Sequence, residues 1–428
     1  MRSLLVLFLL WLASPALLAQ STSQTSQSEP SIQSLLDRIQ QMEKRISELE
    51  ARQGRETAAQ TSNPVLPAPA EHQMVPAAAA PSPALHEHGA TPTEIREAEI
   101  HYPSLQIRGF GDVDFHATDQ KDSTSGFSLG QLDLHFASPL SRKVTYFGEV
   151  TFTAQPTTYD LNVERSFVRF DYNDYFKISF GKFHTPIGYW NTAFHHGAWL
   201  QTTIIRPDMI KFGGTFTPVH IVGAQAEGSI PSGGLGLSYS VALGNGRGAN
   251  FSKAGDSGDF NNNRAWLAKL SSQPFHLSGL EFGGSYYRDE LTPQPGVNFR
   301  EWIAGGYVTW TRGRPELLAE YENVHHASLQ TSQTFNTTGY YAQVAYRLPW
   351  QENKWKPYYR FEYIHRPPQE PVWDSTGTPL VEDLVGSTVG VRWDITNFAC
   401  FKGEYRKVRQ DAGLPSVNGT FFQSAFTF

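Results

Sequence analysis

A serine motif offers the most familiar chemistry in this sequence. The stretch GFSLG, residues Gly126–Gly130, matches the pattern that places a nucleophilic serine on a sharp turn between a strand and a helix. Here QLDLHFA follows, which alternates like a second strand. That alternation also predicts that Ser128 points away from His116 and His135, the candidate bases. We therefore predict that no residue of this chain is catalytic.

Other motifs suggest phosphate or metal binding. GNGRG at 244–248 is glycine-rich, but neither Lys-Ser/Thr nor a helical pattern follows, so we predict a flexible external loop. Seven of the fourteen histidines occur in pairs or in a proline-rich stretch, without the spacing that fixes a metal geometry. They are His72, His86, His88, His195, His196, His325 and His326. The sequence predicts no metal ion and no cofactor.

The elements that must position any site are short strands. About sixteen segments of roughly 9 to 14 residues alternate between apolar and polar residues, as membrane-spanning strands do. In LQIRGFGDVDFH, for example, Leu105, Ile107 and Val113 oppose Arg108 and Asp112. The segments begin near residues 105, 126, 144, 161, 175, 216, 235, 263, 279, 299, 314, 335, 355, 384, 398 and 419. No helical period competes with this pattern beyond residue 105.

The connections and the chain end favour a barrel. Short turns alternate with longer connections, which follow Phe183, Leu243, Arg288, Arg366 and Arg409. The last segment, FFQSAFTF, would be a sticky edge unless it pairs with the first strand near Leu105. Its phenylalanines then face lipid, and Trp302 and Trp310 would lie in the two aromatic belts. We predict an all-β transmembrane barrel of about 16 antiparallel strands at residues 105–428.

Three different segments precede this region. Residues 1–19 have the charged start, the apolar run and the break of a signal peptide. Residues 31–52 carry heptads and predict a coiled coil, with Ile32, Ile39 and Ile46 at one seam position. Ile at this seam position with Leu at the second seam position favours a coiled coil of two helices. The repeated Arg-Ile-x-x-Met/Leu-Glu pattern instead resembles a signature of coiled coils with three helices. Residues 53–100 predict a disordered Ala/Pro-rich linker.

One stretch inside the barrel region does not alternate. Residues from about His184 to Thr215 form a loop long enough to fold into the lumen and to carry its constriction, where charges set ion selectivity. The residues predicted at the constriction are His184, His195, His196, Arg206, Asp208 and Lys211. The residues predicted to line the pore by strand alternation are Arg108, Asp112, Asp114, Glu149, Arg165, Arg169, Arg360, Glu362, Arg392, Lys402 and Arg406.

The overall composition excludes several classes. The formal net charge is -6, which argues against a nucleic-acid partner. The chain has one cysteine, so it has no internal disulfide framework. No apolar run reaches the about 18 residues of a spanning helix.

A resemblance joins these observations. GKFHTPIG at 181–188 is similar to the Gly-Lys/Arg-x-x-x-Pro-x-Gly turn of the phosphate-selective porin O and P family, and the heptads, the linker, GFGDVDF and the terminal Phe428 resemble that family too. The resemblance implies a trimeric sixteen-stranded porin of the bacterial outer membrane, with its N-terminal region in the periplasm. Its solutes would be small and hydrophilic, and anions such as phosphate among them. The alternatives are a tether to peptidoglycan through the coiled coil, and a barrel hydrolase.

Overall fold

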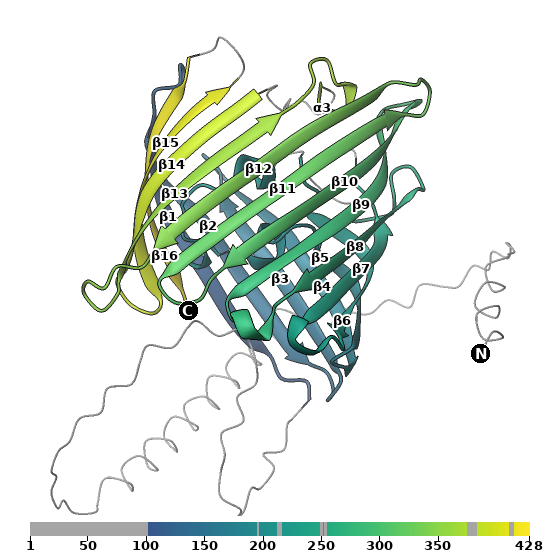
Figure 1. The fold of residues 1–428 in the computed structure, drawn as a ribbon, viewed down its shortest axis with the longest axis horizontal. Coiled ribbons are helices and arrows are strands. Elements are labelled where there is room, and N and C mark those ends of the chain that lie inside the picture. Colours follow the sequence, from purple (N-terminus) through teal and green to yellow (C-terminus); the bar gives the residue numbers. More distant parts are fainter. Residues whose placement is uncertain are drawn as a thin grey trace, which may run out of the picture. The chain divides into compact units, whose positions relative to one another are not determined.

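A computed structural model describes residues 102–194, 197–211, 216–248, 251, 255–374, 383–410 and 415–428. Within these ranges, sixteen antiparallel strands form a closed barrel, in which each strand pairs with its sequence neighbours and the last pairs with the first (Figure 1). The predicted signal peptide, coiled coil and linker lie outside the described residues. The strands are β1 (Gln106–Thr118), β2 (Gly126–Pro139), β3 (Val144–Ala154), β4 (Tyr159–Asn173), β5 (Phe176–His184), β6 (His220–Ile230), β7 (Leu237–Asn245), β8 (Arg264–Ser272), β9 (Leu280–Gln294), β10 (Val297–Trp310), β11 (Pro315–Ser328), β12 (Thr334–Tyr346), β13 (Trp355–His365), β14 (Asp383–Asp394), β15 (Ala399–Gln410) and β16 (Val417–Thr427).

The predicted strands are confirmed, with one error in the connections. The largest difference in a starting residue is at β6, which begins at His220 rather than near 216. The long connection expected after Arg288 is wrong, because β9 continues to Gln294 and β10 begins at Val297. The two intervening residues form a tight turn, in which Gly296 has a φ of 79° that suits glycine.

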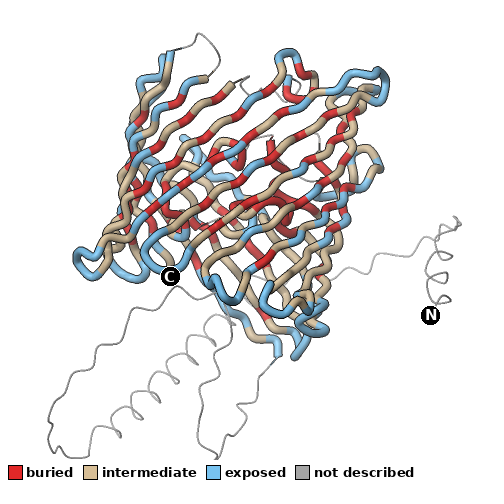
Figure 2. Tube along the Cα trace, viewed as in Figure 1, coloured by how far each residue is buried: buried red, intermediate tan, exposed pale blue. Residues whose placement is uncertain are grey.

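Burial alternates along the strands, as Figure 2 shows. On β10, Glu301, Ile303 and Tyr307 are buried inside the barrel, whereas Trp302 and Trp310 face outward as predicted. Large apolar side chains are exposed on the outer surface of many strands, including Phe127, Val389 and Phe422. An apolar exterior around a polar interior is the arrangement of membrane barrels. Of the described residues, none belongs to a helix that is long and apolar enough to span a membrane.

The chain end closes the barrel. The backbone N–H of Phe428 donates to the carbonyl oxygen of Gly109 at 3.0 Å, and Gly109 donates back to Phe428 at 2.9 Å. The ring of Phe428 lies so close to Gly109 that a Cβ there would come within 2.3 Å of a ring carbon. The first strand therefore needs glycine at this position. The apolar last strand, which would otherwise be an unpaired edge, is paired with it.

The predicted orientation of Ser128 is wrong. The register between β1 and β2 shifts at Gly111 and Val113, and beyond this bulge Ser128 pairs with Asp114. Directly paired residues point to the same side of a sheet, so Ser128 shares the inner face with Asp114 and His116. One extra residue in a strand reverses the alternation of everything that follows.

Candidate pore constriction

The connection between β5 and β6 runs inside the barrel. It contains the helical turns α2 (Trp190–Ala193), η1 (Ala198–Leu200) and η2 (Asp208–Ile210). The turn η1 contacts β1 and β16, and η2 contacts β13 on the same side of the barrel. Figure 1 shows these turns within the ring of strands. We call residues 185–219 the inner loop; its predicted course into the lumen agrees with these contacts.

Carboxylates of the barrel wall hold the backbone of the inner loop. Each accepts hydrogen bonds from loop N–H groups, and such charge-assisted bonds contribute about 1.5–3 kcal/mol each. The pairs are Glu320 with Tyr189 (2.7 Å) and Trp190 (2.8 Å), Glu362 with Asp208 (2.7 Å), and Glu404 with Ile204 (2.9 Å). Three neighbouring regions of the wall, on β11, β13 and β15, thus fix three points along the loop.

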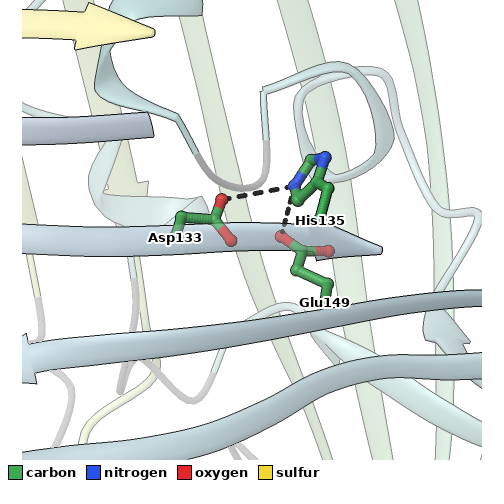
Figure 3. Close-up of side chains that lie close together, drawn as sticks. All are labelled: Asp133, His135 and Glu149. Atoms are coloured by element: carbon green, nitrogen blue, oxygen red, sulfur yellow. Dashed lines mark ion pairs between the residues drawn. The ribbon is translucent and has the colours of Figure 1, made fainter. Parts of the chain in front are cut away.

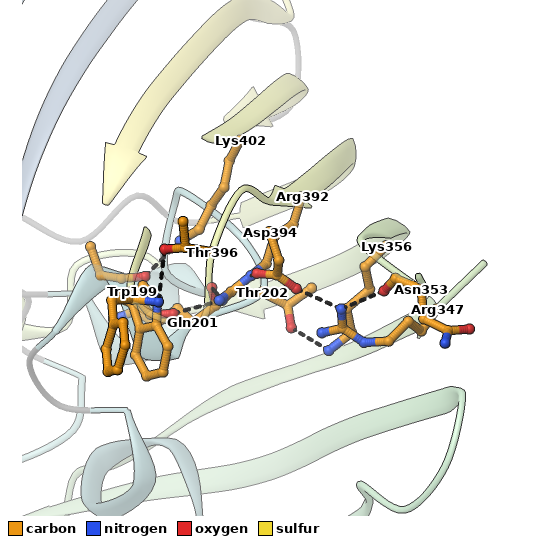
Figure 4. A network of polar contacts seen from close by, with 12 residues as sticks. Trp199, Gln201, Thr202, Arg347, Asn353, Lys356, Arg392, Asp394, Thr396 and Lys402 are labelled. Atoms are coloured by element: carbon orange, nitrogen blue, oxygen red, sulfur yellow. Dashed lines mark hydrogen bonds and ion pairs between the residues drawn. The ribbon is translucent and has the colours of Figure 1, made fainter. Parts of the chain in front are cut away.

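Cations of the same wall hold the carbonyl oxygens of the inner loop. Arg392 and Lys402 reach the loop segment around Trp199 and Gln201, as Figure 4 shows. The bonds run from Arg360 to Ile205 (2.6 Å), from Arg392 to Trp199 (2.6 Å) and Gln201 (2.9 Å), and from Lys402 to Ala198 (2.6 Å) and Thr203 (3.1 Å). A buried charge is tolerated only when it is paired and hydrogen-bonded, and the loop backbone meets that need.

These contacts correct part of the predicted pore lining. Arg360, Glu362 and Lys402 were expected to face water in the lumen, and they do face inward. However, Arg360 is 0% exposed and Lys402 is 3% exposed, because the inner loop covers them. Strand alternation alone could not reveal this cover. Their place is under the loop rather than along a water-filled path, and Arg392 is buried there too.

Aromatic side chains of the inner loop pack on the wall. Trp190 is fully buried, and its ring meets that of Tyr341 edge-on at 5.8 Å. Tyr189 lies 5.6 Å from Tyr307 between ring centroids. Burying a large apolar side chain contributes about 1.5–3 kcal/mol. Apolar packing and charged hydrogen bonds therefore fix the loop together.

The charged loop residues have separate environments. Asp208 forms an ion pair with Arg406, which also binds Glu362 at 2.8 Å. Burial and the neighbouring Glu362 raise the pKa of Asp208, and Arg406 only partly opposes them. Arg206 donates to the carbonyl oxygen of Phe194 at 2.8 Å, and burial lowers its pKa to about 9.

The remaining predicted constriction residues are scattered. Lys211 is exposed to solvent, whereas Arg206 has intermediate exposure. His184 is buried at the end of β5, with its Nε2 3.5 Å from Glu149. His195 and His196 lie outside the described residues. The predicted set therefore does not form one cluster.

A second inward segment was missed. Between β13 and β14, α3 (Pro371–Asp374) buries Trp373, whose ring stacks on Phe216 at 6.5 Å. Arg247 of GNGRG is also buried, donates to the carbonyl oxygen of Phe216 at 2.6 Å and pairs with Glu301 at 3.2 Å. The expectation of a purely flexible external loop there is wrong. The sequence signal for this inward segment was Trp373, a large apolar residue in a connection that does not alternate.

The opposite part of the wall keeps contact with water. A cavity of about 330 Å³ lies against β5 to β8, with Pro186 and Thr192 of the inner loop at its border. Its wall includes Lys177, Glu227 and Lys269. Nearby on β4, Arg169 pairs with Asp171 at 2.9 Å and lies 3.8 Å from Glu227, and all three are about one-third exposed. The predicted lining residues Arg108, Asp112, Asp114 and Arg165 are likewise at least partly exposed.

Comparison with solved structures places this fold among barrels of outer membranes. An anion-selective porin from Comamonas acidovorans has a TM-score of 0.56 at 9% identity, with 76% of this chain and 100% of that chain covered. OmpF of Salmonella typhi, in complex with daunomycin, gives 0.53 at 12% identity, with 76% and 97% covered. The trimer form of OmpT, an outer membrane protein of Vibrio cholerae, gives 0.51 at 13% identity, with 76% and 99% covered.

These likenesses concern the fold. No family model matches the chain, and no curated protein matches it. The phosphate-selective family that the sequence motifs resemble stays a prediction. The barrel architecture itself, predicted from alternation, is confirmed by both the strand pairing and the solved structures.

Proposed function

We propose that this protein is an outer-membrane porin: a passive diffusion channel for small hydrophilic solutes and ions, assembled as a homotrimer in the lipid bilayer. The closed barrel with an apolar exterior supports insertion into a membrane. One solved structure with the same fold is named an anion-selective porin, and another is the trimer form of an outer membrane protein. The N-terminal region would lie in the periplasm, where peptidoglycan is a further candidate partner.

The inner loop is the observation that carries this proposal. It is fastened inside the barrel by buried charged groups on β11, β13 and β15. A segment tied so firmly to one side of the lumen would narrow the passage, and a cavity of about 330 Å³ lies beside it along β5 to β8. The passage then works by size exclusion and by the field of its exposed charges.

The exposed charges support a channel of mixed field. Arg165 pairs with Glu149, which was predicted to line the pore but is buried, and Arg169 pairs with Asp171 and approaches Glu227. Each of these two arginines therefore has a carboxylate beside it. We propose phosphate and other anions as permeating solutes. We do not propose a row of unpaired cationic side chains that selects a single anion.

A barrel hydrolase is the weaker candidate. The bulge in β2 does bring Ser128 to the same face as His116. A serine nucleophile needs a base within hydrogen-bond reach. Among the residues that the structure describes, Ser128 makes no side-chain hydrogen bond to a histidine. The channel is therefore the function that the geometry supports better.

Single-channel recording in planar bilayers tests the proposal. Purified full-length protein should give stable conductance steps, and its reversal potential in a salt gradient should show weak selectivity. A Ser128→Ala variant serves as a control and should conduct like the original. A protein that inserts into the bilayer but never conducts would overturn the porin proposal and leave the tether.

A further inference from the structure

We propose that Asp133 and His135 of β2 and Glu149 of β3 form a binding site for a divalent transition-metal ion on the inner wall of the barrel (Figure 3). The three candidate ligand atoms all lie within 4.8 Å of one another. The Nε2 atom of His135 is 3.3 Å from Asp133 Oδ2 and 3.3 Å from Glu149 Oε1. Two ligands on one Zn²⁺ ion in tetrahedral geometry are about 3.4 Å apart. The two nitrogen–oxygen separations therefore fit a shared ion. The two carboxylate oxygens lie within 4.8 Å of each other, so rotation of the carboxylate side chains, without movement of the strands, would complete the site.

Strand geometry explains why these groups meet. Asp133 and His135 are two residues apart, so they project from the same face of β2. His135 pairs directly with Glu149 across the β2–β3 ladder. Backbone hydrogen bonds hold this register, and the site needs no flexible loop. The sequence signal is Asp-x-His on one strand with a glutamate opposite, which is visible only once the register is known.

The surroundings fix both the imidazole and one carboxylate. Phe110 and Phe147 meet the His135 ring edge-on, with centroid distances of 5.2 and 5.4 Å. Arg165 pairs with the second oxygen of Glu149, Oε2, and leaves Oε1 directed at His135. Metal ligands are commonly oriented by such outer partners. One imidazole with two carboxylates suits Zn²⁺, Mn²⁺ or Fe²⁺.

A second histidine shows what a purely structural arrangement looks like. His326 contacts Glu301 through Nε2 at 2.8 Å and Glu370 through Nδ1. Each ring nitrogen there has its own carboxylate, which suits two N–H donors pointing in opposite directions. At His135 both carboxylates approach one nitrogen at a distance beyond a good N–H hydrogen bond, and a single N–H cannot point at both. An ion between the three groups satisfies them better than a proton.

The site lies beside both ends of the inner loop. His184, where β5 ends, has its Nε2 3.5 Å from Glu149 Oε2. His220, where β6 begins, pairs with His184 across the ladder, and their ring centroids are 5.4 Å apart. Bound metal would therefore stiffen the base of the loop. Metal binding itself does not depend on the porin proposal, so the two can fail separately.

Zinc binding to the folded full-length chain tests the site. Equilibrium dialysis should show one Zn²⁺ fewer per chain for His135→Phe and for Asp133→Asn than for the original protein. The phenylalanine keeps the ring contacts with Phe110 and Phe147 and removes Nε2. Loss of a residue that only orients a metal ligand already lowers metal affinity about 10- to 100-fold. Loss of a ligand itself should lower the affinity of this site for Zn²⁺ by at least as much.

The controls separate this site from other histidines. His365→Phe removes an exposed His–Asp pair with a 2.6 Å contact and should leave the stoichiometry unchanged. The linker histidines are present in every variant, so differences between variants report on the barrel. Co²⁺ should give a visible absorption band that His135→Phe lacks. Equal stoichiometry and equal Co²⁺ spectra in the original and both site variants would overturn the proposal, and Asp133→Asn still decides the matter if His135→Phe does not fold.

Discussion

The inner wall of this barrel has two halves that the sequence makes look alike. Along β9 to β16, and along β2 to β8, alternation directs charged side chains inward with the same period. In the first half, residues such as Glu320 and Arg360 are buried and bind the backbone of the inner loop. In the half from β2 to β8, which we call the open half, residues such as Arg169 and Glu227 pair with one another and stay partly exposed.

This difference shows that a side chain that points into the barrel is not necessarily exposed to water. A charge under the loop has exchanged hydration for loop amide and carbonyl groups, and its role is to hold the loop. A partly exposed charge on the open half, such as Arg169, keeps part of its hydration, and its field reaches any ion that passes. The same residue type therefore has a structural role on one half and a proposed selectivity role on the other.

Removing the inner loop should have the largest effect on this comparison. Replacement of residues 189–216 by a short Gly/Ser linker should raise single-channel conductance several-fold, because the loop occupies the lumen. Shortening the exposed turn at 329–332 is the matched control and should leave conductance unchanged. Equal conductance of the loop-deleted and original channels would mean that the loop does not form the constriction.

Matched carboxylate substitutions on the two halves should differ strongly. Glu320→Ala removes the acceptor for two loop N–H groups and should weaken loop docking by about 2–5 kcal/mol, since buried partners are left unsatisfied. Glu227→Ala on the open half should cost no more than about 1 kcal/mol, as exposed ion pairs usually do. The rate of proteolysis within the inner loop and the open-channel noise would report how firmly the loop is docked in each variant. Similar values for the two variants would contradict the division into halves.

The sequence could predict the barrel because its signal is local. Alternation and turn residues placed every strand within a few residues, and Phe428 at the chain end implied closure. The sequence could not show which inward charges the loop covers, because that depends on contacts such as Arg392 with Trp199, far apart along the chain. The bulge that turned Ser128 inward was also hidden, since one extra residue leaves the local composition unchanged.

Charge reversal of solvent-accessible cations, on the open half and on the inner loop, should change selectivity without undocking the loop. Arg169→Glu and Lys211→Glu should each shift the reversal potential toward cation preference, because both side chains are solvent-accessible. Arg206→Glu is a poorer probe, since it also removes the bond to Phe194. Lys143→Glu, at an exposed turn, is the control. An unmoved reversal potential in both variants would show that the field arises elsewhere.

The smallest expected effect is a pH dependence of loop docking through Asp208. Burial and Glu362 raise the pKa of this carboxyl group in the folded protein above its ordinary value of 3.8. A carboxyl group whose folded pKa is raised favours the docked state fully below the unfolded pKa, and this contribution is lost as pH rises through the folded pKa. Open-channel noise should therefore increase as pH rises above about 4, where the unfolded carboxyl titrates first. Asp208→Asn removes the titrating group and should flatten this part of the profile, whereas Asp171→Asn on the open half should leave it in place. A profile of the Asp208→Asn channel that still follows the original would assign the pH dependence to another group and leave Asp208 as a partner of Arg406 alone.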